Sequence, residues 1–206
     1  MHRKAVKIIR DPEVIKILSD QVRREILRFL AAKPRTETQL AEKLNLSKPS
    51  VGHHLQILLK AGLITVAKVK VGSHGIVEKY YEPTHTLFLE DVDSIPPNLR
   101  RYFIHRYIER LRGMLSAFQV INGMHEQVCI ITPEKLEELA EEIARRTINI
   151  GEKYSEIETK IGRESLFIKI CSETLRSIMR ESQWKNFFAG VKSSPESGDV
   201  SVKEFY

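Results

Sequence analysis

The sequence predicts a mainly α-helical protein in which two short helices and a β-hairpin come first and a region of long helices follows. Three observations predict this fold class. Residues 36–64 have the apolar spacing of two helices joined by a three-residue turn. Residues 64–81 change to the alternating spacing of strands, and the residues after Pro96 return to helical spacing. Two short helices followed by a hairpin make a winged helix-turn-helix.

Local signals set the limits of the two short helices. Thr36 and Gln39 form a capping box that opens the first helix, and Ser47 is positioned to cap the second. Gly62 ends the second helix because glycine tolerates the left-handed conformation found just after a helix. Within it, apolar residues recur at i, i+4 and i+7 and should point inward: Val51, Leu55 and Leu58.

The second helix carries small, polar and basic groups near its N-terminus, which suits the major groove of double-stranded DNA. We expect Lys48 and Gln56 to reach base edges, His53 to face DNA, and His54 to order the helix or reach a phosphate. The full set of expected DNA-binding residues on this helix is Ser47, Lys48, Ser50, Gly52, His53, His54 and Gln56.

Residues 47–64, SKPSVGHHLQILLKAGLI, resemble the recognition helix and following turn of ArsR-type winged-helix transcription regulators. The similar features are Ser47 and Ser50, the His54-Leu55 pair, and the Ala61-Gly62-Leu63 ending. The resemblance covers roughly the first 85 residues and implies a DNA-binding fold. Many members of this family sense metals through a Cys pair in the helix before the recognition helix. The matching segment here, residues 37–44, contains no Cys, which argues against that metal site.

The alternating stretch predicts a wing with strands at residues 64–71 and 76–81 and turn residues between them. Its basic and polar side chains are placed to meet phosphates or a minor groove. The alternative is a hairpin that merely packs and exposes its lysines. The expected DNA-binding residues of the wing are Lys68, Lys70, Ser73, His74 and Lys79.

Two helices should pack behind the helix-turn-helix. Asp11-Pro12-Glu13 begins the first, which should bury Val14, Ile17 and Leu18. Asp20 begins the second, which Lys33-Pro34 stops. Residues 1–10 form a basic arm that could be flexible, a short strand or a DNA-touching extension.

Long helices should follow residue 96. One runs to about Asn122-Gly123, and Thr132 caps another that carries a heptad repeat of apolar residues. Gly151 and Gly162 weaken this repeat, so the helix should bend or stop there. The repeat could be a seam between two subunits or a buried seam within one chain. The expected dimer interface comprises Leu111, Phe118, Leu136, Ile143, Ile150 and Ile157.

These elements divide the chain into a DNA-binding domain at residues 1–90, a helical dimerisation region at 91–192 and a flexible tail at 193–206. The balance of basic and acidic residues differs between the N-terminal and C-terminal parts of the chain. Residues 1–85 hold 16 Lys and Arg against 8 Asp and Glu, whereas residues 86–206 hold 17 against 19. A local basic surplus suits a phosphate backbone, although a solvated basic surface is the plainer alternative.

The apolar content and the motifs that the sequence lacks exclude several classes of protein. An apolar content of 42% excludes disorder throughout. No secretion signal or membrane span is apparent, so we expect a cytoplasmic protein. No catalytic or phosphate-binding motif occurs, and we expect neither an enzyme nor a cofactor. His125 and Cys129 could offer two metal ligands, but a surface His and a buried Cys are the simpler interpretation, and we expect no metal site.

Together these features predict a homodimeric, sequence-specific DNA-binding transcriptional regulator that recognises a pseudo-palindromic operator. The first alternative is a sensor that binds a small-molecule effector among its C-terminal helices. Aromatic residues that could line such a pocket are Tyr102, Tyr107, Phe118 and Tyr154. A protein-interaction module built on a winged helix is the second alternative.

Overall fold

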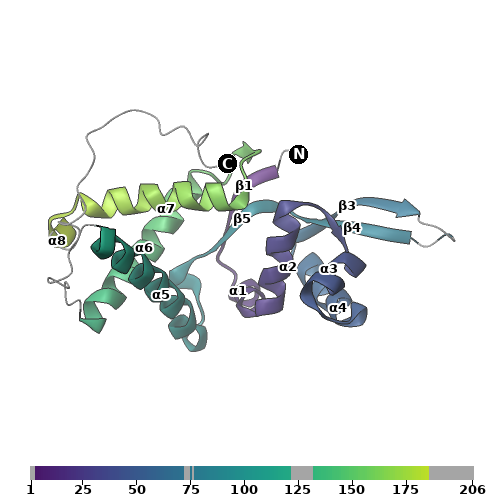
Figure 1. The fold of residues 1–206 in the computed structure, drawn as a ribbon, viewed down its shortest axis with the longest axis horizontal. Helices are drawn as coiled ribbons and strands as arrows, with labels where there is room; N and C mark the ends of the chain where they lie inside the picture. The colour runs from purple at the N-terminus through teal and green to yellow at the C-terminus, as the bar shows by residue number, and fades with distance from the viewer. Residues whose placement is uncertain (1–2, 72–74, 76, 122–131, 186–206) are drawn as a thin grey trace.

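The computed structural model describes residues 3–71, 75, 77–121 and 132–185 of the 206-residue chain. The molecule is elongated, with the helix-turn-helix and a projecting hairpin at one end and the C-terminal helices at the other (Figure 1). In chain order the elements are β1 (Arg3–Ile9), α1 (Pro12–Ser19), α2 (Gln21–Ala32), β2 (Arg35–Thr36), α3 (Glu37–Leu44), α4 (Lys48–Lys60), β3 (Ile64–Val71), β4 (Val77–Pro83), β5 (His85–Glu90), the 3₁₀ helix η2 (Val92–Ser94), α5 (Pro97–Ile121), α6 (Pro133–Glu152), β6 (Glu158–Thr159), α7 (Arg163–Met179) and α8 (Ser182–Lys185).

The winged helix-turn-helix predicted from the sequence is present. Helices α1 to α4 enclose a core, and β2, β4 and β3 form a three-stranded sheet beside them. Asp11 and Asp20 cap α1 and α2 by accepting hydrogen bonds from the backbone N–H groups of Glu13 and Arg23. The prediction of which α1 residues are buried was correct for Leu18 and wrong for Val14 and Ile17. Ile15 and Leu18 are its buried residues, while Val14 and Ile17 are only partly buried, because the helix turns a different edge toward the core.

The basic arm at the N-terminus is a strand. β1 pairs in parallel with β5, with Lys4 opposite His85, and antiparallel with the short β6. Parallel pairing needs a long crossover connection, and here the whole helix-turn-helix and its hairpin lie between the two strands. β1 and β5 therefore join the start of the chain to the segment that leaves the hairpin.

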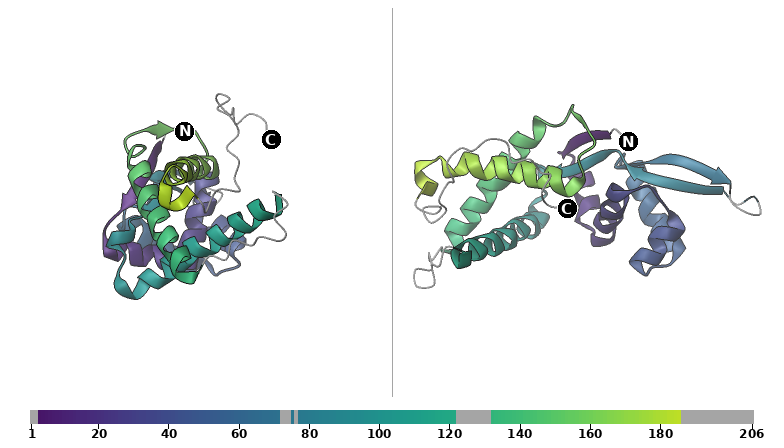
Figure 2. Two further views of the ribbon diagram at one scale, coloured as in Figure 1. Left: turned by 90° about the vertical axis from the view of Figure 1, so that its left-hand side faces the viewer. Right: turned by 45° about the horizontal axis from the view of Figure 1, so that its top comes forward.

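A second, smaller core lies between this sheet and the C-terminal helices. Val6 of β1 and Leu87 of β5 pack there against Ile148 of α6 and Ile170 of α7. Strands from the segment expected to bind DNA thus share a core with helices from the segment expected to dimerise. The right-hand view in Figure 2 shows α5, α6 and α7 on the side of the molecule away from the wing.

The heptad-bearing helix stops at Glu152, next to Gly151, and Gly162 occupies the N-cap position of α7. Both glycines therefore mark interruptions, as expected. The other expected interface residues are placed as follows: Leu111, Leu136, Ile143 and Ile150 are buried within one chain, and Ile157 is 47% exposed. For the four buried residues the structure corresponds to the intrachain alternative, since each is at most 8% exposed and offers a partner almost no surface.

Some expectations fall outside the described residues. Phe118 lies within α5, but its side chain is not described, and Ser73, His74, His125, Cys129 and the tail at 193–206 lie outside the described ranges. Across the helices that are described, none combines the length and the apolar character needed to cross a bilayer.

Candidate nucleic-acid interface

Helices α3 and α4 are joined as the sequence predicts. Thr36 Oγ1 accepts from the N–H of Gln39 at 3.2 Å, and Gln39 Oε1 accepts from the N–H of Thr36 at 3.2 Å. These reciprocal bonds satisfy two donors at the start of α3. Asn45 then takes a left-handed conformation with φ of 53°, which ends α3 and sets the direction in which α4 leaves.

Helix α4, the recognition helix, is anchored along one side. Ser47 Oγ accepts from the N–H of Ser50 at 3.3 Å and caps its start. Val51, Leu55 and Leu58 are at most 1% exposed in the core. Gly62, with φ of +63°, lets the chain turn sharply into β3. This anchoring fixes which side of the helix faces outward.

Four of the expected DNA-binding residues of α4 are exposed: Ser47, Lys48, His53 and Gln56. Ser50, Gly52 and His54 are half-buried. The outward stripe thus offers hydroxyl, ammonium, imidazole and carboxamide groups, which can all form hydrogen bonds with base edges or phosphates.

His54 differs from its neighbour His53 in its surroundings. Its Nδ1 atom is buried and has no hydrogen-bond partner among the described residues. Burial lowers the pKa of the His54 ring, while the nearby carboxylate of Asp20 opposes this shift. His54 is thus partly enclosed by the domain, whereas His53 is exposed.

Gly52 provides space for an acidic side chain. A Cβ placed on Gly52 would lie 3.1 Å from Oε1 and 3.4 Å from Oε2 of Glu37, the first residue of α3. The carboxylate therefore lies against the bare backbone of the recognition helix. Glu37 was not among the residues expected from the sequence, although a glycine in the middle of a recognition helix was a signal that another group approaches there.

The wing, which is the β3–β4 hairpin, divides its lysines between two faces. A β-bulge between Val66 and Lys68 shifts the register, so that Lys68 lies opposite Tyr80. Lys68 and Lys70 share that face, with Nζ atoms 4.6 and 5.6 Å from the centroid of the Tyr80 ring. Lys79 pairs with Val69 on the other face. The structure therefore does not bring the three expected lysines together.

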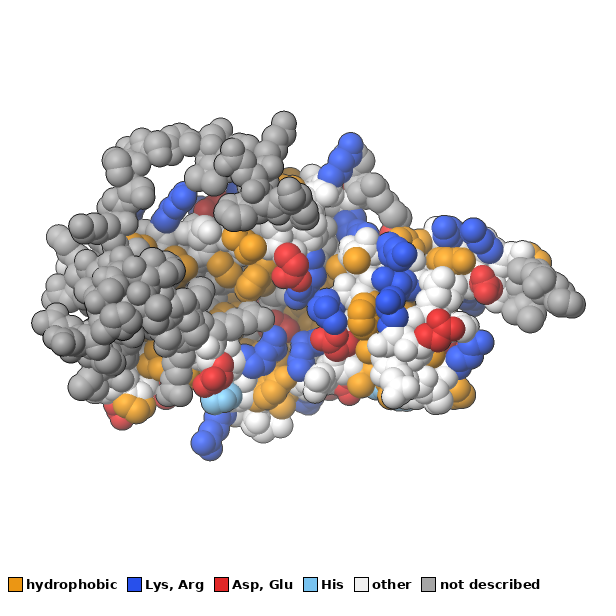
Figure 3. All heavy atoms as spheres, in the orientation of Figure 1, with side chains coloured by type: hydrophobic (Ala, Val, Ile, Leu, Met, Phe, Trp, Pro, Cys, Tyr) orange, Lys and Arg blue, Asp and Glu red, His pale blue; other side chains and the backbone are white. Residues whose placement is uncertain are grey.

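The face that carries Lys79 is otherwise apolar. Val71 lies directly opposite Val77, and Val69 is two residues away on the same face. These valines are 55% to 72% exposed. The Tyr80 face holds the two ammonium groups of Lys68 and Lys70 and also the carboxylate of Glu78, which lies opposite Lys70. Figure 3 shows Lys and Arg side chains along the wing and again near the middle of the molecule.

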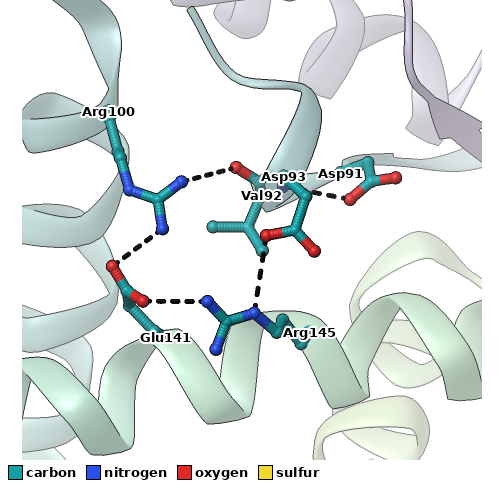
Figure 4. Close-up of polar contacts among 6 residues, drawn as sticks. All are labelled: Asp91, Val92, Asp93, Arg100, Glu141 and Arg145. Atoms are coloured by element: carbon teal, nitrogen blue, oxygen red, sulfur yellow. Dashed lines mark hydrogen bonds and ion pairs between the residues drawn. The ribbon is translucent and has the colours of Figure 1, made fainter. Parts of the chain in front are cut away.

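Ion pairs hold the segment that leaves the winged helix-turn-helix against the C-terminal helices (Figure 4). Arg100 of α5 donates to the Val92 carbonyl at 3.2 Å and to Glu141 of α6 at 2.9 Å. Arg145 of α6 donates to Glu141 at 3.0 Å and to Asp93 of η2 at 3.4 Å. Glu141 thus links two guanidinium groups, and η2 is fixed to both long helices.

A small cleft lies at the junction of α2, β5, α5 and α7. Its volume is about 130 Å³. Phe103, Tyr107 and Phe167 line it together with the Arg106 side chain. Of the aromatic residues expected to line an effector pocket, Tyr107 is present, whereas Tyr102 is 39% exposed and Tyr154 donates to Glu173 at 2.5 Å near α7. Within the described ranges, no three His, Cys, Asp or Glu side chains cluster closely enough to hold a metal ion.

Known proteins resemble the first part of this chain. Residues 20–66 match the family model described as bacterial regulatory protein, arsR family. Transcriptional repressor SdpR of Bacillus subtilis (strain 168) is 46% identical over 52 residues, which are 25% of this chain and 58% of that protein. The chain therefore covers less than two thirds of that relative's length. The matched segment runs from the N-cap of α2 into β3 and is similar to ArsR-type helix-turn-helix domains, and the β3–β4 hairpin that follows it forms a wing.

Proposed function

We propose that the protein is a homodimeric transcriptional regulator that binds double-stranded DNA in a sequence-specific manner. The recognition helix α4 enters the major groove, and the wing contacts phosphates or the minor groove of the flanking duplex. The relative SdpR is named as a transcriptional repressor, which supports a role in transcriptional regulation.

One observation carries this proposal. Helix α4 is anchored by Val51, Leu55 and Leu58 while Lys48 and Gln56 stay exposed. An anchored helix holds the backbone of its base-reading residues in one fixed position, so little backbone entropy is lost when they bind. Lys can donate to the guanine O6 and N7 acceptors, and Gln can bond the N6 and N7 atoms of adenine.

Dimerisation is part of the proposal because helix-turn-helix proteins usually meet DNA as two-fold dimers. The buried heptad residues are unsuited to an interface between subunits. Exposed apolar side chains remain at Ile157, Ile161 and Ile168, which are 47%, 45% and 63% exposed. We propose that this part of the C-terminal region, which includes Ile157 from the expected interface, contributes to the dimer contact.

Binding-site selection from a random duplex library, carried out with the full chain, tests the proposal. Two recognition helices in successive major grooves require half-site centres about 34–36 Å apart, which is one turn of DNA. The proposal predicts a pseudo-palindrome with that spacing. Recovery of single, unpaired half-sites would contradict the dimer, and recovery of no preferred sequence would contradict sequence-specific binding.

Response to a small molecule is a second candidate, supported by the cleft between α2, β5, α5 and α7. A ligand there would touch α2 of the winged domain and α5 of the C-terminal region at once. Small aromatic acids match its aromatic lining and the Arg106 guanidinium. A thermal-shift screen of such acids tests this candidate, which requires a compound that stabilises the wild type but not the Arg106→Gln variant.

A further inference from the structure

The Glu37 carboxylate lies beside the recognition helix α4, next to Gly52. Glu37 is half-buried, and none of the hydrogen bonds or ion pairs among the described residues involves its side chain. Its charge is felt by Tyr81 of β4, whose pKa is raised first by burial and then by Glu37. The carboxylate thus lies where α3, α4 and the base of the wing meet. A partly buried carboxylate in this state favours any ligand that offers it a hydrogen-bond donor.

The Glu37 carboxylate, which belongs to α3, lies against the middle of α4. It lies against Gly52 at 3.1 Å from the place a Cβ would occupy. Gly52 is four residues after Lys48 and four residues before Gln56, and residues four apart lie on the same stripe of a helix. The Lys48 and Gln56 side chains are exposed, while the place between them has no side chain of its own. Glu37 fills that place from the neighbouring helix.

The chemistry of a carboxylate limits what it can recognise there. An ionised Glu only accepts hydrogen bonds, and phosphate groups repel it. In the major groove the base-edge donors are the N4 amino group of cytosine and the N6 amino group of adenine, and Glu accepts from cytosine N4. Adenine also presents its N7 acceptor beside N6, which would face the carboxylate unfavourably.

We infer that Glu37 determines specificity by accepting a hydrogen bond from cytosine at one position of each half-site, in the place that Gly52 leaves open. This inference rests on the proposed function, because it requires α4 to occupy a major groove. Gly52 then leaves space for the Glu37 side chain. The groups that contact base edges lie in the order Lys48, Glu37 and Gln56 along the outer side of α4.

Binding-site selection with wild type, Glu37→Gln and Glu42→Gln tests the inference. Glu42 is an exposed carboxylate on the same helix, so its replacement controls for the loss of one negative charge. We expect Glu37→Gln to lose a cytosine preference of about 5- to 150-fold at one position of each half-site, and to accept adenine there. Glu42→Gln should keep every preference.

A second variant, Gly52→Ala, tests whether Gly52 is needed to position Glu37. In Gly52→Ala the new Cβ displaces the carboxylate, so the same base position should lose its preference, while thermal unfolding confirms that the domain still folds. If the wild type selects a site and both variants select the same site with unchanged preferences, the inference is overturned. If the wild type itself selects no sequence, the proposed regulator function fails, which is a separate result.

Discussion

Gly151 of α6 lies so close to Leu89 of β5 that a Cβ on the glycine would come within 2.6 Å of Leu89 Cδ1. Leu89 is 4% exposed and packed in the smaller core, so it has little room to move. The last turn of α6 rests at this point on the β5–β1–β6 sheet.

Replacing Gly151 by Val should therefore destabilise the protein, despite the low helix propensity of glycine. Overpacking of a core costs about 1–3 kcal/mol, which exceeds the roughly 0.5 kcal/mol that Val gains over Gly in a helix. Asn149→Val, at an exposed position of the same helix, is the matched control. Urea unfolding of both variants measures the difference, and equal stabilities would show that the sheet yields to the new side chain.

Charges in the heptad stripe should unfold the chain and not merely separate subunits. Ile143 and Ile150 are 7% and 8% exposed, and an unpaired buried carboxylate costs several kcal/mol. Ile143→Asp with Ile150→Asp should abolish cooperative unfolding and the native circular dichroism signal. Ile157→Asp with Ile168→Asp, at exposed sites, should keep the fold and shift sedimentation toward a monomer. A folded protein after the first pair of changes would contradict the intrachain packing of α6.

Sequence signals were sufficient wherever structure depends on neighbouring residues. The Thr36 capping box, the Ser47 cap and the Gly62 turn act within a few residues, and the helices they delimit were predicted closely. The pairing of β1 with β5 joins Lys4 to His85 across the whole winged domain, and no local pattern encodes it. Likewise, a heptad repeat records only that one side of a helix is buried. It does not say whether the covering surface belongs to the same chain.

The exposed face of the recognition helix could be predicted from the sequence, whereas the groups that other elements bring to it could not. The outward residues of α4 follow from helical periodicity, and Lys48, His53 and Gln56 are exposed as that periodicity predicts. The wing lysines were named from the alternating pattern alone. Their division between two faces depends on the β3–β4 register and on a bulge near Lys68, which cannot be read from the residues alone. Glu37 comes from a different helix, so only the packing of α3 on α4 reveals it.

The two faces of the wing should contribute unequally to DNA binding. Lys68→Ala with Lys70→Ala removes both ammonium groups of the Tyr80 face. If this face meets phosphates, affinity for operator and scrambled duplexes should fall by similar factors, and the slope of log affinity against log salt should flatten by about 0.9 for each phosphate that is no longer neutralised. Lys79→Ala, on the opposite face, should leave the slope unchanged. A flatter slope for Lys79→Ala alone would place the duplex against the valine face.

Stability should fall in mildly acidic solution because two histidines, His54 and His85, are partly buried. Burial is the main cause that lowers the pKa of His54 and of His85, and Lys7 and Lys4 lower that of His85 further while Glu156 opposes. The unfolded chain then takes up protons first, so this stability is fully present above the unfolded-state pKa of about 6.5 and is lost as pH falls below it. His85→Gln should reduce the loss measured by urea unfolding between about pH 7.5 and 5.5. An identical pH dependence in the variant would exclude His85 as a source.

The ion pairs around η2 should stabilise the chain only modestly. Arg100 and Glu141 have 36% and 24% exposed side chains, and partly exposed ion pairs contribute about 0–1 kcal/mol. Glu141→Gln should therefore lower the free energy of unfolding by about this amount at low salt, and by less in concentrated salt, where charges are screened. Glu137→Gln, an exposed carboxylate on the same helix, is the control. A destabilisation that does not change with salt would indicate packing as its origin.

Base reading by the recognition helix is the central claim, and Gln56 tests it most directly. The measurement is the affinity of wild type and Gln56→Ala for the selected operator and for each of its single-base variants, at one salt concentration. We predict that the variant loses about 1–3 kcal/mol of discrimination at one base position per half-site and keeps the preferences elsewhere. Unchanged discrimination at every position would contradict the placement of α4 in the major groove with Gln56 toward the bases.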